Sequence, residues 1–385
     1  KHSVAAVCLL ASLAFSVAAQ DSGQTNTGES ALFRGEQLLI TGSYAAATDI
    51  FQMADGLDRN EGLVGASKAF AMMGNYQEAM SVVESAIEDD EYARFPLLST
   101  QLAEVKRAVG ESKEALEILE SVVVGLAESP VRTLVQYGSL LDFVGQRQIA
   151  FSVLDQAVQR YNNGLVFASE DVAMVALASW LMGNFHDANS LFNEATRANP
   201  NNLEAHSLWG DLFLEKYNAS DAERSYQEAI DINGRYVPAL VGMANVVGDE
   251  RALQRALAIN PNSIPAMETY GQLLMVNGRE EEAQDYFERV LALNPESLKT
   301  LSVLASQAAL EERSADYQGY LAQVESFSPN NPIFLGNVAD SFGNNYLFDE
   351  AVEFARAAIA ADPQYWQGYT VLGSNLIRLG EEEEG

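Results

Sequence analysis

The sequence of 385 residues carries 54 acidic and 23 basic side chains, for a formal net charge of −31. This charge argues against nucleic acid or an anionic membrane surface as the main partner, because both are bound through basic patches. The chain has a single cysteine, Cys8, so it cannot form an intramolecular disulfide. It has only three histidines, His2, His186 and His206, so few side chains are available to bind a metal or redox centre.

The first residues have the order of an export signal. Lys1 and His2 form a short basic region, residues 4–19 are apolar or small throughout, and Val17-Ala18-Ala19 offers a cleavage site. We therefore expect a signal peptide over residues 1–19 and a protein exported to the periplasm or beyond. The apolar stretch is shorter than the about 20 residues of a membrane helix. The alternative is an N-terminal anchor that is never cut.

Residues 20–29 contain no large apolar side chain, so they predict a flexible linker. No other stretch is apolar enough and long enough to span a membrane. The chain has no initiator Met and stops at Gly385 within a helical pattern. We interpret it as a fragment of a longer reading frame.

Prolines mark a repeat in the remainder of the chain. Pro261, Pro295, Pro329 and Pro363 lie 34 residues apart, and Pro200 precedes Pro261 by 61. Proline cannot continue a helical hydrogen-bond ladder, so each one ends a helix and starts the next.

Each period contains two helical patterns separated by a break such as Asn277-Gly278. In the period from 261 to 295 the two apolar faces are Met267, Tyr270, Gly271 and Leu274, followed by Ala283, Phe287 and Val290. The spacings of three and four residues indicate one face of a helix in each case. Glycine costs a helix about 1 kcal/mol relative to alanine. The recurring glycine therefore predicts a close approach of two helices.

This order of bulky, small and aromatic residues in a 34-residue period resembles the tetratricopeptide repeat family. The register extends over residues 30–385 as eleven units, the last of them half complete. The resemblance implies an all-α fold, a right-handed superhelical solenoid of stacked helix-turn-helix units. It also implies a concave groove, lined by the first helix of each unit, that binds a protein or peptide partner.

Two units depart from the pattern. The ninth has Tyr317 where the family has alanine, so we expect its second helix to sit further out. The seventh is short, because residues 238–260 contain only Gly248-Asp249 as a break. The missing residues amount to about two helical turns, and we expect the solenoid to kink there.

The sequence shows no catalytic constellation. It contains no H-E-x-x-H, phosphate loop or nucleophile elbow. His186 and His206 are isolated, and the acidic run 280–282 suits the start of a helix. Three bases at groove positions, Arg132, Lys299 and Arg378, are scattered over different units and do not form a carboxylate clamp. We predict a non-catalytic protein without a cofactor or metal.

A narrower resemblance covers residues 251–385. Segments 255–263, 310–329 and 360–384 are similar to exported bacterial proteins in which the repeats precede a peptidase MA-like metallopeptidase domain. The main interpretation is an exported interaction scaffold. The alternative is the non-catalytic repeat region of a larger exported metallopeptidase, whose catalytic domain would lie beyond residue 385.

The segment 171–182 has an apolar stripe beyond its core face. By register the core face comprises Val172, Val175, Ala176 and Ser179. The second stripe, which we predict as a partner-binding groove, comprises Ala173, Leu177, Trp180 and Leu181. A helix that is apolar all round is normally buried on all sides. Two interpretations stay open: superhelical curvature buries Trp180 against a neighbouring unit, or Trp180 anchors a partner.

Overall fold

The structure is a computed structural model that describes residues 27–88, 95–123, 128–216 and 218–381. The predicted signal peptide 1–19 and residues 20–26 of the predicted linker lie outside the described residues. The first helix begins at Thr27, slightly ahead of the expected start of the solenoid at residue 30. Across the described ranges the regular structure is helical, with 21 α-helices and no strand.

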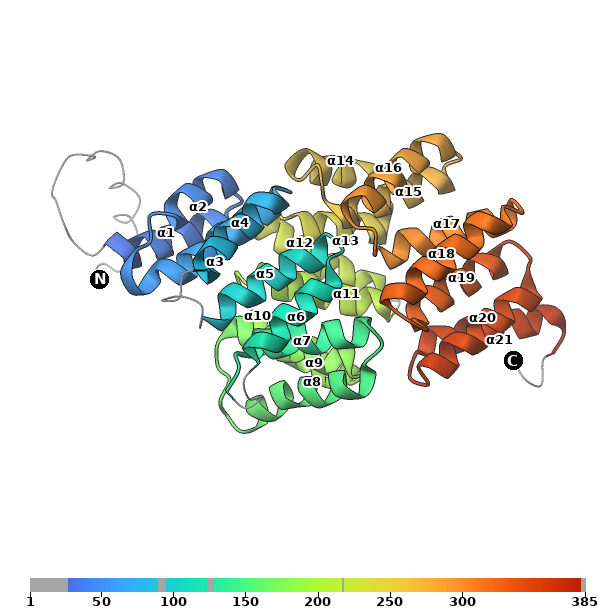
Figure 1. Cartoon of the computed structure of the whole chain (residues 1–385), viewed down its shortest axis with the longest axis horizontal. Coiled ribbons are helices and arrows are strands. Elements are labelled where there is room, and N and C mark those ends of the chain that lie inside the picture. The colour runs from blue at the N-terminus through green and yellow to red at the C-terminus, as the bar shows by residue number, and fades with distance from the viewer. Residues whose placement is uncertain (1–26, 89–94, 124–127, 217, 382–385) are drawn as a thin grey trace, which may run out of the picture.

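The helices form ten antiparallel pairs and one final helix (Figure 1). A single 3₁₀ turn, Gly56–Asp58, precedes the third helix. The bounds are α1 Thr27–Ile40 and α2 Tyr44–Phe51; α3 Arg59–Met72 and α4 Tyr76–Ile87; α5 Pro96–Ala108 and α6 Ser112–Val122; α7 Val131–Phe143 and α8 Arg147–Asn162; α9 Ser169–Leu181 and α10 Phe185–Ala198; α11 Leu203–Glu215 and α12 Ala219–Ile232; α13 Val237–Val247 and α14 Glu250–Ile259; α15 Ile264–Val276 and α16 Glu280–Leu293; α17 Leu298–Leu310 and α18 Ser314–Phe327; α19 Pro332–Asn344 and α20 Phe348–Ala361; and α21 Trp366–Leu379.

The segments that carry the prolines connect one helix pair to the next, as the spacing predicted. In the connection before α15, the Oδ1 of Asn260 accepts a hydrogen bond from the backbone N–H of Asn262 at 3.0 Å. Ser263 then caps α15 by accepting from Ala266 N–H at 3.4 Å. A serine at this position satisfies one of the amide groups that a helix start leaves unpaired.

Glycines in the helices allow close packing, which confirms the interpretation of their recurrence. The ring of Tyr226 on α12 is completely buried and lies between Gly210 of α11 and Gly242 of α13. A Cβ atom on Gly210 would come within 2.6 Å of this ring, and one on Gly242 within 2.2 Å. Neither distance is compatible with an ordinary carbon contact.

Both irregular units are visible. Helices α13 and α14 contain 11 and 10 residues, whereas α15 and α16 of the next pair contain 13 and 14. The kink expected from this shortening stays a prediction. Helix α18, which carries Tyr317, buries only Val324, whereas α20 buries four residues. The sparse burial agrees with a second helix that packs less closely than its counterparts.

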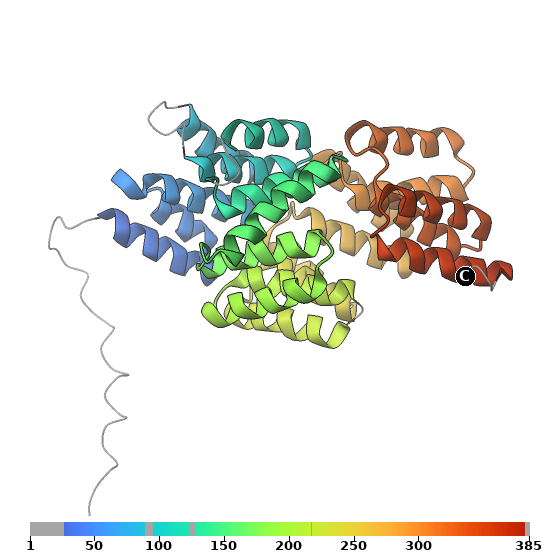
Figure 2. The ribbon, with the colours of Figure 1, turned by 90° about the horizontal axis from the view of Figure 1, so that it is seen from below.

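The solenoid coils back on itself, so that segments distant in sequence lie side by side (Figures 1 and 2). The hydroxyl of Tyr44, at the start of α2, donates to the carbonyl of Arg235 before α13 at 3.1 Å. The hydroxyl of Tyr76, at the start of α4, donates to the carbonyl of Asn262 before α15 at 3.2 Å. The seventh pair therefore begins beside the first, and the eighth beside the second. We call this line of contacts the inter-turn seam.

The seam continues along later pairs. The turn before α6 meets the connection before α17, where Ser112 N–H donates to Glu296 at 3.2 Å. Arg147, at the start of α8, forms an ion pair of 2.8 Å with Asp362 before α21. Because each connection meets the corresponding earlier turn, the seam fixes the pitch of the coil and encloses the space inside its first turn.

Candidate functional site

A cavity of about 380 Å³ lies inside the first turn of the coil. Its walls come mainly from the first helices of successive pairs, α1, α3, α5, α7, α9 and α11, and it is completed by Tyr236 at the start of α13. Leu39, Ile40, Met72 and Leu203 supply apolar wall. The volume falls in the usual range for small-ligand sites, and we call it the inner cavity.

An ion-pair network joins three helices at this cavity. Arg132 on α7 donates from Nη1 to Glu104 on α5 at 3.0 Å and from Nη2 to Glu204 on α11. Burial alone would lower the pKa of Arg132, but the two carboxylates outweigh it and raise that pKa. Burial opposes ionisation of Glu204, and the Arg132 charge outweighs it, so the pKa of Glu204 is lowered. The positive charge of Arg132 is thus paired with the negative charges of Glu104 and Glu204.

One buried polar atom beside the inner cavity has no such partner. The Oε1 atom of Gln101, in a residue only 4% exposed, has no hydrogen-bond partner among the described residues. Buried polar groups are nearly always paired, so the unpaired Oε1 atom of Gln101 is an exception. Tyr236, which is 7% exposed, also lines the cavity.

Lys68 on α3 also lines the inner cavity and is half-buried. Burial and then the nearby Arg132 lower the pKa of Lys68, while the neighbouring carboxylates act in the opposite direction.

The charges of the cavity wall nearly cancel. Lys68 and Arg132 face Glu104, Glu170 and Glu204, two positive charges against three negative ones. Glu170 also accepts a hydrogen bond from the side chain of Asn199 at 3.1 Å. The cavity is therefore weakly negative, in contrast to the strongly acidic chain as a whole.

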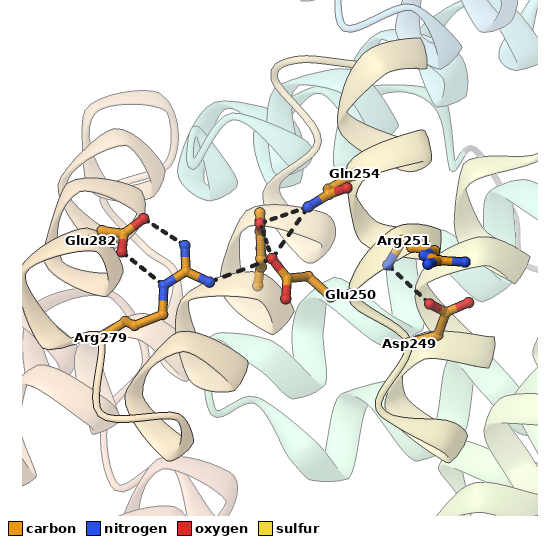
Figure 3. A network of polar contacts seen from close by, with 7 residues as sticks. Asp249, Glu250, Arg251, Gln254, Arg279 and Glu282 are labelled. Atoms are coloured by element: carbon orange, nitrogen blue, oxygen red, sulfur yellow. Dashed lines mark hydrogen bonds and ion pairs between the residues drawn. The ribbon is translucent and has the colours of Figure 1, made fainter.

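A second polar cluster, on α14 to α16, consists of side chains that form hydrogen bonds and ion pairs with one another (Figure 3). Glu250 accepts from the hydroxyl of Tyr270 at 2.7 Å and from Arg279 at 3.4 Å, and Gln254 donates to both Glu250 and Tyr270. Arg279 also pairs with Glu282. The hydrogen bond from Tyr270 is the main cause of the lowered pKa of Glu250. The side chains of Glu250, Gln254, Tyr270, Arg279 and Glu282 are thus paired with one another.

The predicted groove stripe on α9 is only partly at the surface. Ala173 is completely buried, so it offers no contact area, whereas Leu177, Trp180 and Leu181 are half-buried. The indole N–H of Trp180 donates to Glu215 at 2.6 Å. The same carboxylate accepts from Trp366 on α21 at 3.1 Å. Trp180 is thus tied to the place where the last helix meets the first turn.

The core face predicted for α9 is confirmed. Val172, Val175, Ala176 and Ser179 are all buried, with exposed fractions of 2% or less. Met174 is also buried, and the extra apolar stripe adds Ala173 to that core.

The isolated histidines and bases do not gather at one place. His206 is buried, with Nε2 lying 3.0 Å from the carbonyl oxygen of Pro200, and His186 is exposed. Lys299 donates to Thr269 at 3.4 Å, and Arg378 donates to the carbonyl of Gly343 at 2.9 Å. Of the three bases named from the sequence, only Arg132 lines the inner cavity.

Within the described residues there is neither a group of metal-ligand side chains nor a helix that could span a membrane. No three His, Cys, Asp or Glu side chains in those ranges are grouped as metal ligands would be. None of the helices described has the length and apolar character of a membrane span.

Comparison with known proteins identifies the repeats. Residues 176–236 and 264–297 each match a family model described as tetratricopeptide repeat. These segments are tetratricopeptide repeats. No curated protein matches the chain.

Two solved structures resemble the chain to different degrees. The chain is similar to one in the crystal structure of the APC/C hetero-tetramer Cut9–Hcn1, with a TM-score of 0.55 and 12% identity, covering 89% of this chain and 69% of that one. It also matches yeast Tom70 with a TM-score of 0.38 and 15% identity, over 91% of this chain and 80% of the other. The predicted fold class, an all-α right-handed superhelical solenoid of tetratricopeptide units, is confirmed. The peptidase-like resemblance of residues 251–385 finds no support in these comparisons.

Three polar residues that line the inner cavity, Lys68, Gln101 and Tyr236, escaped the sequence interpretation. Lys68 lies among small and apolar residues on a first helix, and Gln101 follows Ser99 and Thr100 on the next. A polar side chain at an inward position of a tetratricopeptide first helix is the signal that could have singled them out. Tyr236 had no such signal, because only the return of the coil brings it to the cavity.

Proposed function

We propose that this chain is a protein-interaction scaffold that binds a segment of a partner protein at the inner face of its first superhelical turn. One observation carries the proposal: a cavity of about 380 Å³, with both apolar and polar side chains in its wall, lies on the inner face of six successive first helices. Concave sites of this volume and mixed lining are typical of ligand binding. The similar Cut9 chain is itself part of a hetero-tetramer with Hcn1.

Site-specific photocrosslinking tests this proposal. A photoreactive amino acid would replace either Met72 or Leu203, which line the inner cavity. In the control it would replace Val276, which is 85% exposed at the end of α15. In extract from the native cells, we expect discrete adducts from the two inner positions and none of the same mass from Val276. Adducts that form equally at all three positions, or only at Val276, would contradict an inner-face function.

Export and the wider context of the chain are part of the same proposal. The order of basic, apolar and small residues over 1–19 supports export with cleavage after Ala19. Mass spectrometry of the N-terminus of protein recovered from the cell envelope tests it, and an intact Lys1 would contradict cleavage. The alternative, a repeat region within a larger metallopeptidase, rests on the resemblance of residues 251–385 and requires an H-E-x-x-H in the full reading frame.

The stripe on α9 is a second proposed contact surface, now limited to Leu177, Trp180 and Leu181. If Trp180 anchors a partner, Trp180→Ala should weaken binding by about 2 kcal/mol and leave unfolding nearly unchanged. If it is a packing residue tied to Glu215, the same substitution should cost about 3–5 kcal/mol of stability. Thermal unfolding and partner binding measured on one variant separate the two.

A further inference from the structure

We propose that a second copy of this chain docks head to tail on the coil and continues the inter-turn seam between the two molecules. Each pair of antiparallel helices has a hairpin turn at one end and the connections to its neighbours at the other. All hairpin turns therefore lie on one side of the coiled ribbon, and all connections lie on the other. The inference is independent of the inner cavity and of what binds there.

The seam consumes only one side of each superhelical turn. A Cβ atom on Gly74, in the hairpin turn before α4, would lie 2.2 Å from Oδ1 of Asn260. One on Gly110, before α6, would lie 2.5 Å from Oδ1 of Asn294. Connections of the second superhelical turn thus cover hairpin turns of the first. Two sides of the ribbon remain: the hairpin turns of the second superhelical turn, which we call the hairpin edge, and the connections of the first, which we call the connection edge.

The hairpin edge repeats a motif that the seam covers elsewhere. Gly248 and Gly278 have φ angles of 70° and 72°, close to the 78° and 79° of Gly42 and Gly74. A Cβ atom on Gly248 or Gly278, however, would meet nothing within 4 Å. The backbone that receives a connection in the first superhelical turn is therefore present in the second without any cover from the described residues.

An apolar position in this motif makes contacts across the seam. Met72, two residues before Gly74, packs against the buried cluster that contains Tyr236 of the second superhelical turn. Phe143, two residues before Gly145, stacks on Phe327 at the end of α18, with ring centroids 5.8 Å apart. This position therefore belongs to the cross-turn interface wherever the seam is closed.

The same position is exposed on the hairpin edge. Val276, two residues before Gly278, is 85% exposed, and Leu310, two residues before the positive-φ residue Glu312, is also exposed. Val247 and Tyr346 are exposed at the hairpin turns on either side of these two. Four consecutive hairpin turns thus present an apolar side chain that no described residue covers, and such rows mark interaction surfaces.

The connection edge offers a matching surface. Met53 is exposed in the connection before α3, and Leu165 and Phe167 are exposed in the connection before α9, Phe167 by 80%. Residues 162–168 contain no charged side chain. The two free edges are thus the two kinds of surface that the seam already joins within one chain, and both are apolar. A copy of the chain supplies the missing side to either edge, which makes the contact heterologous.

The charge of the chain opposes this contact only at long range. Two copies that each carry a net charge of −31 repel one another. At the hairpin edge itself Arg279 is paired with Glu282, and Arg313 is paired with Asp316. The edges therefore meet through apolar side chains, and salt should favour the contact because it screens the repulsion.

Sedimentation velocity of the whole purified chain tests the proposal. We expect the average mass to rise with protein concentration in the micromolar range and to pass that of a dimer, because each copy in a head-to-tail contact keeps one free edge. Added salt should strengthen the association.

Two single variants separate the edges. Val276→Ser changes the hairpin edge and Phe167→Ser changes the connection edge, and each should weaken self-association at least about tenfold through lost apolar burial. An equimolar mixture of the two variants should associate again, but only as far as a dimer, since each variant keeps one intact edge. Ile333→Ser is the matched control and should change nothing. Ile333 is 51% exposed at the start of α19, on the side of the second superhelical turn that the seam already covers.

The mixture distinguishes a lost contact from a lost fold, because misfolded variants would not restore each other. A chain that stays monomeric at every concentration overturns the proposal. So does association that survives both edge variants, or a mixture that associates no better than its components. A wild-type assembly that stops at a dimer would indicate a symmetric contact instead, and association that weakens with salt would indicate ion pairs; either result overturns the apolar head-to-tail contact.

Discussion

The side-chain amide of Asn294 donates a hydrogen bond to the main-chain carbonyl of Ala108, which lies 186 positions earlier in the chain, at 3.2 Å. Ala108 is the last residue of α5, so its carbonyl has no partner within the helix. Asn260 makes the equivalent bond to Ala71 near the end of α3 at 3.3 Å. At Pro261 and Pro295, the asparagine that precedes the repeat proline thus caps a helix of the previous superhelical turn.

The first prediction concerns this seam. Asn294→Ala should lower the free energy of unfolding by about 1–2 kcal/mol, because it removes the seam bond and leaves the Ala108 carbonyl without that partner. Asn199→Ala is the control. Asn199 also precedes a proline and also accepts from the backbone two residues later, but its amide bonds Glu170 at the surface rather than an earlier helix end. Urea unfolding that shows equal losses for both variants would contradict a seam-specific contribution.

The second prediction concerns the glycine beside Tyr226. Gly242→Ala should destabilise the protein by about 1–3 kcal/mol, because its Cβ would lie 2.2 Å from a completely buried ring. Gly319→Ala on α18 has nothing within 4 Å of the added carbon. That variant should gain up to about 1 kcal/mol from the better helix propensity of alanine. Thermal unfolding of the two variants should therefore move in opposite directions, and a common direction would argue against close packing as the reason for Gly242.

The helix pairs were predictable from the sequence because their signals are local. Prolines 34 residues apart and the glycines before most second helices act within one repeat, and the structure places helix boundaries at those positions. The seam was not predictable in this way. Its position depends on a small rotation between neighbouring pairs, added up over a whole turn, and no single repeat encodes that sum.

The inner cavity is formed by the return of the coil at the inter-turn seam, and no sequence motif marks it. Leu39 and Tyr236 line one cavity only because the seventh pair returns beside the first. The partner-binding role of the stripe on α9 stays a prediction, and its surroundings also depend on the coil. Its apolar side chains are used where the coil meets itself, with Trp180 bonded to the carboxylate that also bonds Trp366.

The third prediction concerns Arg132, which joins α5, α7 and α11 across the inner cavity. Arg132→Met should cost about 3 kcal/mol of stability, because it leaves Glu104 and Glu204 facing one another without their common cation. Arg313→Met serves as the control, since Arg313 pairs with Glu311 and Asp316 at side-chain exposures of 40–52%. Exposed pairs contribute about 1 kcal/mol or less. Similar losses of unfolding free energy for both variants would show that the Arg132 network contributes no more than a surface pair.

The last prediction concerns the pH dependence of stability through Asp211 on α11. Burial raises the pKa of Asp211 from 3.8 to about 6, although the hydrogen bond from the Tyr226 hydroxyl, at 2.6 Å, acts in the opposite direction. The folded state therefore holds this proton more tightly than the unfolded chain. The resulting stabilisation is fully present below about pH 4 and is lost as the pH rises through about 6.

Asp211→Asn removes this titration and keeps an oxygen that can accept from Tyr226. Relative to the wild type, the variant should gain stability steadily between about pH 4 and pH 6 and then remain constant. The gain should reach at most about 3 kcal/mol, from 1.36 kcal/mol per pKa unit. Chemical unfolding of both proteins across this range measures the difference. Asp231→Asn, at an exposed position of α12, controls for the loss of one charge. A difference between Asp211→Asn and wild type that does not change with pH would mean that Asp211 has the same pKa in the folded and unfolded states.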